Sequence, residues 1–248
     1  LIRLNKPERR NAFDLEMRAE LAEAIFAARD DPEVRAVVLA GSQGTFCAGG
    51  DLRALSGQRR PVAENRDRIR RLHPWFRELV NLEKPVIAAV DGPAFGAGFN
   101  LALACDFILG TPRTRFCAVF GRIGLVPDLG GFFLLPRIVG LQRAKELVFS
   151  ARELAADEAQ QMGILFAIHE PQALEPAALA MAQRFAQAST GSIGMAKNIL
   201  NRSFNLDQDT LAELESYAQA VAIESDYHGD AVERFKAKQP LSFVWESK

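Results

Sequence analysis

Hydrophobic positions in the first half of the chain follow two patterns, one helical and one typical of buried strands. From Leu15 to Arg29, apolar side chains recur at helical spacing with charges between them, which predicts an amphipathic helix. Three short, continuous apolar runs are typical of strands buried on both faces: 35–40, 85–90 and 106–109. Two helical segments separate these runs: 59–82, which Pro61 and Pro74 are expected to interrupt, and 95–104. The chain therefore predicts an α/β fold with crossover connections.

The pattern changes after Gly140, where helical segments follow one another: 141–149, 156–162, 173–189, 191–203, 207–225 and 228–238. We therefore predict a sheet core in residues 1–140 and a helical region in residues 141–248. The chain begins at Leu1 in the middle of an apolar pattern, so we expect a short N-terminal piece to precede it.

Composition narrows the class of protein. The 248 residues carry a net charge of −1 and are 48% hydrophobic, which argues against disorder and against general nucleic-acid binding. The longest uncharged stretch, 36–50, is shorter than the ~20 residues of a membrane-spanning helix, so no membrane partner is expected. Three cysteines without a CxxC motif favour a reducing cytoplasm, and three scattered histidines argue against a metal site.

Two glycine-rich loops each follow a predicted strand and open a helix. They are Thr45–Leu52 and Asp91–Asn100. Unpaired N–H groups at such helix starts can hold a phosphate, and two converging loops can hold a developing oxyanion. The alternative is that small residues simply allow close packing of a buried helix against the sheet.

A third segment, 116–131, carries a single carboxylate, Asp128, among apolar side chains. A carboxylate in such surroundings is expected to have a raised pKa, which suits a general base. The local sequence equally allows a turn residue or an N-cap before the next helix.

Seven segments in register resemble the crotonase (enoyl-CoA hydratase/isomerase) superfamily over nearly the whole chain: 4–12, 46–52, 84–94, 96–98, 104–106, 124–131 and 135–140. The resemblance implies a spiral of ββα turns with a C-terminal helical trimerisation region. It also implies an acyl-CoA thioester substrate, with coenzyme A as part of the substrate rather than a separate cofactor. The expected assembly is a homotrimer or a dimer of trimers.

The resemblance also assigns site residues by position. The backbone N–H groups of Gly50 and Ala97 form the oxyanion hole for an enolate. Coenzyme A lies along two segments, and its candidate contacts are Arg10, Ala12, Ala48, Asp51, Leu52 and Arg53. The arginines are candidates for its phosphates, although a solvated surface charge is the commoner role of a single arginine.

The catalytic positions distinguish members of the superfamily. Hydratases use two glutamates, which here are Asn100 and Phe120, so only Asp128 remains as a base. The pattern is closest to 1,2-epoxyphenylacetyl-CoA isomerases of phenylacetate catabolism. It implies an isomerase that shifts a double bond, or rearranges a ring, with Asp128 as proton shuttle.

Three alternatives remain open from the sequence. They are a hydratase, an aryl-CoA-processing enzyme with Asp128 as nucleophile, and a non-catalytic acyl-CoA-binding protein. The dehalogenase branch carries Trp at the position of Phe120, which this chain does not. The resemblance implies that residues 53–76 vary among members of the superfamily and shape the acyl pocket. Trp75 and Phe76 in this region either line that pocket or belong to the core. Six arginines within 59–71 are either an attraction for CoA phosphates or a solvated helix face.

Overall fold

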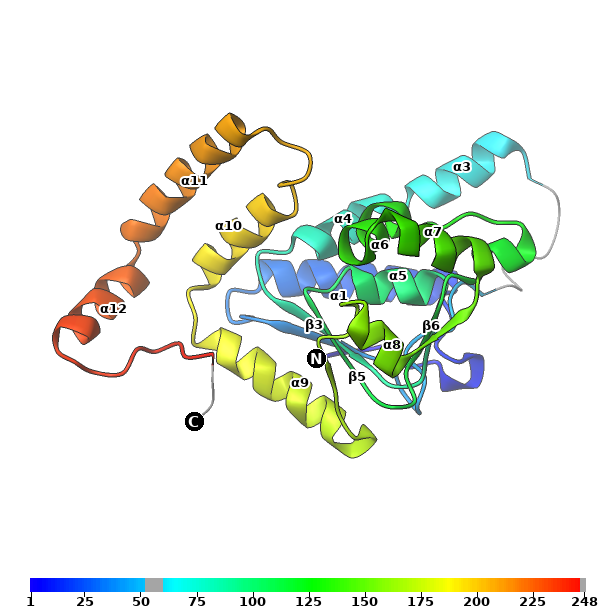
Figure 1. The fold of residues 1–248 in the computed structure, drawn as a ribbon, viewed down its shortest axis with the longest axis horizontal. Coiled ribbons are helices and arrows are strands. Elements are labelled where there is room, and N and C mark those ends of the chain that lie inside the picture. The colour runs from blue at the N-terminus through cyan, green and yellow to red at the C-terminus, as the bar shows by residue number, and fades with distance from the viewer. Residues whose placement is uncertain (52–59, 246–248) are drawn as a thin grey trace.

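Two sheets form the centre of the protein in a computed structural model that describes residues 1–51 and 60–245 (Figure 1). The larger sheet has the strand order β1-β2-β3-β5-β8, and all its pairings are parallel. Its strands are β1 (Ile2–Arg3), β2 (Val37–Ala40), β3 (Val86–Val90), β5 (Phe107–Gly110) and β8 (Ala167–Ile168). The smaller sheet consists of β4 (Pro93–Phe95), β6 (Arg115–Cys117) and β7 (Glu153–Ala155).

Helices cover both faces of the larger sheet, which explains why its strands read as continuous apolar runs. One face lies in a large core with side chains of α1 (Leu15–Asp30), α4 (His73–Asn81) and α5 (Ala97–Leu103). The other face packs against α9 (Pro171–Ala186) in a second cluster. Alternate residues of β3 enter the two clusters, as the period of two requires.

The remaining helices complete the layers around this core. They are η1 (Pro7–Arg9), α3 (Val62–Arg70), η2 (Val119–Ile123), α6 (Gly131–Val139), α7 (Leu141–Ser150), α8 (Ala156–Gln161), α10 (Thr190–Leu200), α11 (Gln208–Ile223) and α12 (Asp226–Lys236). The predicted strands at 35–40, 85–90 and 106–109 are confirmed as β2, β3 and β5. The helical stretch at 59–82, with its expected interruptions at Pro61 and Pro74, forms two helices in the described residues. Helix α3 begins after Pro61 and ends at Arg70, and α4 begins at His73 with Pro74 in its first turn.

The predicted division near residue 140 remains a prediction, but the sheets take strands from both sides of it. Strand β7 pairs with β6, and β8 pairs with β5 at the edge of the larger sheet. Helices α10 to α12 then extend away from the core in Figure 1. The chain returns to α9, where the rings of Phe243 and Trp245 lie 6.3 and 5.4 Å from that of Phe185.

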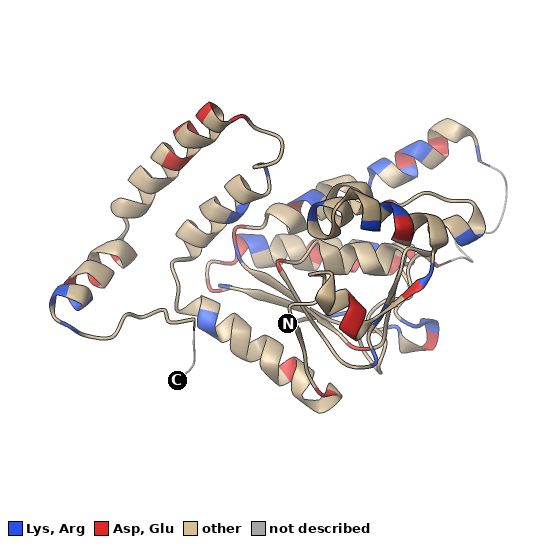
Figure 2. Ribbon diagram, viewed as in Figure 1, with Lys and Arg blue, Asp and Glu red and all other residues tan. Residues whose placement is uncertain are grey.

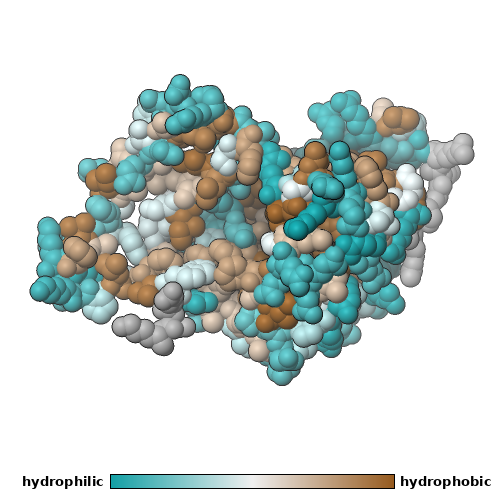
Figure 3. Space-filling view, viewed as in Figure 1, coloured by the Kyte–Doolittle hydropathy of each residue, from teal (hydrophilic) through white to brown (hydrophobic). Residues whose placement is uncertain are grey.

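The extended helices expose apolar side chains, which Figure 3 shows as brown areas over this arm. In α11 and α12, both fully described, no residue is buried, and exposed apolar residues include Tyr217, Val221 and Phe235. Across 1–51 and 60–245, no helix is long and apolar enough to cross a membrane.

A buried ion pair joins the first helix of this arm to the sheet. Lys197 of α10 keeps 6% of its side chain exposed, and its Nζ lies 2.8 Å from Oδ2 of Asp106. The same carboxylate oxygen accepts the N–H of Val86 at the start of β3, at 2.7 Å. Burial raises the pKa of Asp106 even beside this ammonium group, so the carboxylate depends on Lys197 to remain ionised at low cost.

Replacing Lys197 is expected to destabilise the protein, because it leaves the Asp106 carboxylate without its counter-charge. We expect Lys197→Met to lower the free energy of unfolding by ~2–3 kcal/mol, somewhat less than for a fully buried pair. Urea unfolding at fixed protein concentration measures the change. Lys236→Met removes the exposed pair with Glu233 and serves as the control, with an expected change below ~0.5 kcal/mol. Equal effects of the two substitutions would contradict the structural role of the Lys197–Asp106 pair.

Candidate active site

Two glycine-rich loops meet at the carboxyl ends of β2 and β3. The N–H groups of Phe46 and Cys47 both donate to the carbonyl of Pro93, at 3.1 Å each. In return, the N–H of Phe95 donates to the carbonyl of Cys47 at 2.9 Å. Residues of the two loops thus form a short parallel bridge, which sets their relative position through the backbone.

Small residues are required where these loops touch. Gly49 has a φ of +97°, and a Cβ there would lie 2.8 Å from the carbonyl oxygen of Phe95. A Cβ at Gly98 would overlap with the carbonyl oxygen of Cys47. Close packing and an oxyanion hole both need small residues, so the glycines alone do not decide between these two readings.

The hydrogen bonding of two backbone N–H groups, those of Gly50 and Ala97, helps to distinguish an oxyanion hole from simple close packing. Phe13 pairs with the residues on either side of Gly50: its N–H donates to Gly49 at 2.7 Å, and its carbonyl accepts from Asp51 at 3.0 Å. Within the described part of the chain, the N–H groups of Gly50 and Ala97 make no backbone hydrogen bond. The nitrogen of Ala97 lies 3.7 Å from the ideal Cβ position of Gly49, so the second loop presents its N–H beside the first. This arrangement can bind one oxygen between two backbone donors.

Asp128 lies in the turn before α6. Its Oδ1 atom is buried and has no hydrogen-bond partner among the described residues. Burial raises the pKa of this carboxyl above its ordinary value, while the side chains of Arg18 and His73 partly oppose the shift. Its carboxylate is not an N-cap, because α6 begins after Gly130, a residue with a φ of 69°. A half-buried carboxylate with a raised pKa and one buried, unsatisfied oxygen is a candidate proton acceptor.

Asn100 supports the backbone of that turn. Its side chain on α5 is 3% exposed, and its Nδ2 donates to the carbonyl of Asp128 at 2.7 Å. The N–H of Gly131 donates to the same carbonyl at 3.0 Å. A Cβ at Gly131 would lie 2.6 Å from Nδ2 of Asn100, so glycine is needed for the amide to reach the turn.

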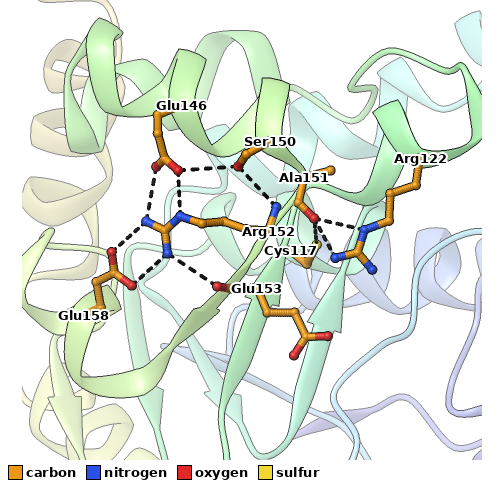
Figure 4. Close-up of polar contacts among 8 residues, drawn as sticks. All are labelled: Cys117, Arg122, Glu146, Ser150, Ala151, Arg152, Glu153 and Glu158. Atoms are coloured by element: carbon orange, nitrogen blue, oxygen red, sulfur yellow. Dashed lines mark hydrogen bonds and ion pairs between the residues drawn. The ribbon is translucent and has the colours of Figure 1, made fainter.

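Phe120 lies beside the second loop, where its ring approaches the ideal Cβ position of Gly96 to 3.8 Å. The short helix η2 carries Phe120 and also Arg122, whose side chain contacts Ala151 after α7, as Figure 4 shows. Arg122 donates from Nε and Nη2 to the carbonyl of Ala151, at 3.0 and 2.6 Å. The thiol of Cys117 donates to the same carbonyl at 3.0 Å. These contacts fix an apolar ring, rather than a carboxylate, at this side of the site.

The predicted CoA contacts lie along η1 and the first loop. The N–H of Ala48 donates to the carbonyl of Arg10 at 3.0 Å, and Arg10 is exposed. Ala12 is 9% exposed. The Asp51 carboxylate accepts from Nη1 of Arg9 at 3.0 Å. Leu52 and Arg53 lie outside the described residues. Helix α3 has no buried residue and carries acidic as well as basic side chains (Figure 2), as a solvated helix face does.

Three further side chains that the sequence analysis considered are Phe76, Trp75 and Cys47. Phe76 is 7% exposed, and its ring closely approaches Gly130 in the turn that carries Asp128. Trp75 is buried and packs edge-on against Phe76. Burial raises the pKa of Cys47 to about 12, which keeps this residue a protonated thiol and not a nucleophile.

Sequence reasoning missed two arginines. Arg9 binds Asp51, and Arg18 of α1 lies within electrostatic range of Asp128 and Cys47. The signal for Arg18 is its spacing, because it precedes Ala22 and Phe26 at four-residue intervals on a half-buried stripe of α1.

A profile of the enoyl-CoA hydratase/isomerase family matches residues 1–248. The chain belongs to this family. The resemblance drawn from the seven sequence segments is therefore confirmed, and so is the α/β fold of the superfamily. The trimer that the resemblance implies is not shown by these comparisons.

Individual relatives cover nearly the whole chain. The chain is 35% identical over 243 residues to 1,2-epoxyphenylacetyl-CoA isomerase of Escherichia coli, with 97% of this chain and 93% of the relative covered. It is 31% identical over 248 residues to short-chain-enoyl-CoA hydratase of Clostridium acetobutylicum, with 97% and 92% covered. A solved structure of an enoyl-CoA hydratase/isomerase from Cupriavidus metallidurans has a TM-score of 0.92 and 42% identity, with 98% and 91% covered.

These relatives are enzymes, and the chain is an enzyme of the same family. They include an isomerase and a hydratase, so membership alone leaves the exact activity undetermined. The local geometry of the site must therefore decide which activity to test first.

Loss of the Asn100 amide is expected to disturb the turn that carries Asp128. We expect Asn100→Ala to lower kcat for an enoyl-CoA substrate ~10–100-fold, because one of two donors to the Asp128 carbonyl is lost. KM is expected to change much less, since the amide donates to backbone and not to solvent. Asn198→Ala removes an exposed amide contact with Glu83 and is the control. Unchanged kcat in Asn100→Ala would show that the turn is held without the amide.

Proposed function

We propose that the protein is an acyl-CoA isomerase that shifts a double bond, or rearranges a ring, of an enoyl-CoA thioester. The observation that carries this proposal is the half-buried carboxylate of Asp128, whose Oδ1 atom is buried and has no hydrogen-bond partner in the described residues. The two positions where hydratases of the family carry glutamates hold Asn100 and Phe120. One base without a second carboxylate suits proton transfer between two carbons.

The proposed reaction moves one proton and one double bond. Asp128 removes a proton from C2 of a 3-enoyl thioester, and the C–H electrons form a dienolate with its charge on the thioester oxygen. The N–H groups of Gly50 and Ala97 bind this oxyanion, which lowers the barrier to its formation. Asp128 then returns the proton to C4, and the double bond lies between C2 and C3. Atoms and charge balance, and water is not consumed.

Addition of water is the second candidate, because a hydratase is among the relatives. Hydration requires a water molecule held and activated beside C3, usually by a second base. In this chain the Asn100 amide donates to the Asp128 backbone, and the buried ring of Phe120 offers no hydrogen bond. These contacts favour isomerisation over hydration.

Coenzyme A is proposed to bind along η1 and the first loop, with the Arg10 side chain near its phosphates. Arg10 is exposed and has a left-handed backbone conformation with a φ of 52° at the end of η1. The carbonyl of Arg10 accepts a hydrogen bond from the N–H of Ala48, so the backbone of Arg10 is joined directly to the oxyanion loop. The relation to 1,2-epoxyphenylacetyl-CoA isomerase makes phenylacetate degradation the first pathway to examine. Three free, buried cysteines support the proposed cytoplasmic location.

We also propose that copies of this chain cover the exposed faces of α11 and α12, in a trimer or a dimer of trimers. Helices in proteins are stabilised chiefly by the packing of an apolar face. Helices α11 and α12 contain no buried residue in the isolated chain. A cavity of about 1290 Å³ also separates α11 from the core, with Phe133, Leu134 and Tyr217 among its lining residues. Exposed apolar surface of this extent is typical of subunit contacts.

Removal of the Asp128 carboxylate is the direct test of the isomerase proposal. We expect Asp128→Asn to lower kcat for conversion of 3-hexenoyl-CoA to 2-hexenoyl-CoA ~10²–10⁴-fold, the usual contribution of a general base. Absorbance of the conjugated thioester measures the reaction, and deuterium uptake at C2 and C4 in heavy water follows the proton. Asp157→Asn changes an exposed carboxylate far along the chain and is the control. Hydration products that persist in Asp128→Asn would reject the proposal.

The pH dependence of the reaction follows from the same carboxyl. The base must be ionised, so kcat/KM is expected to fall as the pH drops through the Asp128 pKa. Because burial raises this pKa, the acid limb is expected above the ordinary value of about 3.8. A rate profile with 3-hexenoyl-CoA measures the limb. A flat profile down to the ordinary value would contradict Asp128 as the base.

Sedimentation tests the proposed assembly. We expect the wild-type protein to have a mass of three or six times the 27.3 kDa of one chain. We expect Val221→Asp to shift the protein toward single chains, because this substitution places a charge on the exposed face of α11. Glu215→Gln on the same helix is the control. A wild-type protein that sediments as a single chain would exclude the trimer.

A further inference from the structure

The turn after η1 contains two consecutive residues in the left-handed backbone conformation. Arg10 and Asn11 have φ values of 52° and 53°. Neither is a glycine, and this conformation is unfavourable for residues with a side chain, although asparagine adopts it more readily than most. Such a turn persists only where its surroundings hold it in place. Asn11 lies fully inside the protein, with 0% of its surface exposed, so its own side chain is the first contact to consider.

The Asn11 amide fills all four of its hydrogen-bonding positions. Its Oδ1 accepts the N–H of Lys6 at 2.9 Å and the hydroxyl of Ser42 at 3.1 Å. Its Nδ2 donates to the carbonyls of Ser42 and Thr45, at 3.2 and 2.7 Å. An asparagine amide offers two acceptor and two donor positions, so this side chain is fully satisfied. The amide thus joins the residue before η1 to residues 42–45, which lie 31 to 34 positions farther along the chain than Asn11.

These contacts are made where the chain enters the first glycine-rich loop. Thr45 directly precedes the two residues whose N–H groups bind Pro93 of the second loop. The backbone is tightly packed here, because a Cβ at Gly41 would overlap with the Thr45 carbonyl oxygen that Asn11 binds. Removing the amide takes a donor from this carbonyl in a confined space, which costs free energy unless the loop shifts.

Backbone hydrogen bonds join the same turn to the far end of the loop. The carbonyl of Arg10 accepts from Ala48 at 3.0 Å, and the N–H of Phe13 donates to Gly49 at 2.7 Å. Gly50, the proposed oxyanion donor, forms a parallel bridge with Phe13. The turn therefore contacts both ends of the loop, one end through the buried amide and the other through the backbone.

We propose that Asn11 is a positioning residue that sets the place of the Gly50 N–H by clamping the first loop onto the turn that carries Arg10. The inference rests on the proposed function, because it concerns the thioester oxygen that Gly50 and Ala97 bind there. Arg10 is exposed, and its flexible side chain can follow a phosphate when the backbone shifts. A backbone N–H has no such freedom, so loss of the amide acts on the oxyanion more than on CoA binding.

The first test measures the oxyanion contact in a complex that does not react. Isotopically labelled hexanoyl-CoA is bound to wild type and to Asn11→Gly, and its carbonyl stretch is recorded by infrared difference spectroscopy. Two backbone donors polarise the carbonyl, so we expect its frequency in wild type to lie below that in water. We expect Asn11→Gly to move the frequency back toward that in water, because the Gly50 donor is displaced. Glycine adopts a positive φ freely, so backbone strain does not contribute to this change.

Turnover of 3-hexenoyl-CoA gives the second measurement. We expect Asn11→Gly to lower kcat ~10–100-fold while KM stays within about threefold, the scale of a donor misplaced by about 1 Å. Gln43→Gly is the control, because it changes an exposed residue of the same region with a φ of 50°, and neither measurement is expected to change.

Two further variants test the donors of the amide. Asn11→Asp keeps the size of the side chain but places an oxygen against the carbonyls of Ser42 and Thr45, so we expect a loss at least as large as in Asn11→Gly. Ser42→Ala removes only the hydroxyl that binds Oδ1 and keeps the Thr45 contact, so a milder loss of ~2–10-fold in kcat is expected, with a smaller change of frequency in the same direction.

The outcomes separate positioning from packing and from the proposed reaction. Wild-type behaviour of Asn11→Asp would show that the side chain only fills space, and would overturn the proposal. So would an unchanged frequency in Asn11→Gly or, if that variant does not fold, in Ser42→Ala, and so would a wild-type frequency equal to that in water. A frequency that moves in Asn11→Gly, in a protein that shifts no double bond, would support Asn11 and reject the isomerase. A double-bond shift that Asp128→Asn abolishes and Asn11→Gly leaves unchanged would do the reverse.

Discussion

The close approach of two backbone loops is the constraint on which the rest of this site depends. Three hydrogen bonds between residues 46–47 and 93–95 hold the loops together at the ends of β2 and β3. A side chain at Gly49 or Gly98 would force them apart, because backbone oxygens occupy the space. The donors at Gly50 and Ala97 contribute no side-chain chemistry, so their function rests entirely on this geometry. Preorganised donors of this kind stabilise charge without rearrangement during reaction.

The carboxylate is positioned by a different principle. Asp128 lies in a turn whose carbonyl is held by the Asn100 amide and the N–H of Gly131. One oxygen of its side chain is buried and has no hydrogen-bond partner in the described residues, and the positive charge of Arg18 partly opposes the rise of its pKa. A direct ion pair would satisfy the carboxylate and reduce its basicity.

The core and the C-terminal arm have different sources of stability. The larger sheet is covered on both faces, and its two apolar clusters bury every residue of β2 and β3. The arm is attached through the Lys197–Asp106 pair and through aromatic contacts of the last described residues with Phe185. Its own helices α11 and α12 bury nothing within the described chain. Within one chain, the arm is therefore stabilised at α10 and where the chain returns to α9.

The sequence by itself determined the core and the family. Continuous apolar runs identified β2, β3 and β5 because strands buried on both faces need no polar positions, and seven motifs in register identified the superfamily. It did not reveal β4, β6 and β7, since strands of three residues are too short to show a period. It also placed Asp128 without showing whether the carboxylate caps a helix or faces a site. Tertiary structure decided that, along with the partner of Asn100. The contact between Asn100 and Asp128 joins residues 28 positions apart, and local patterns carry no information about such contacts.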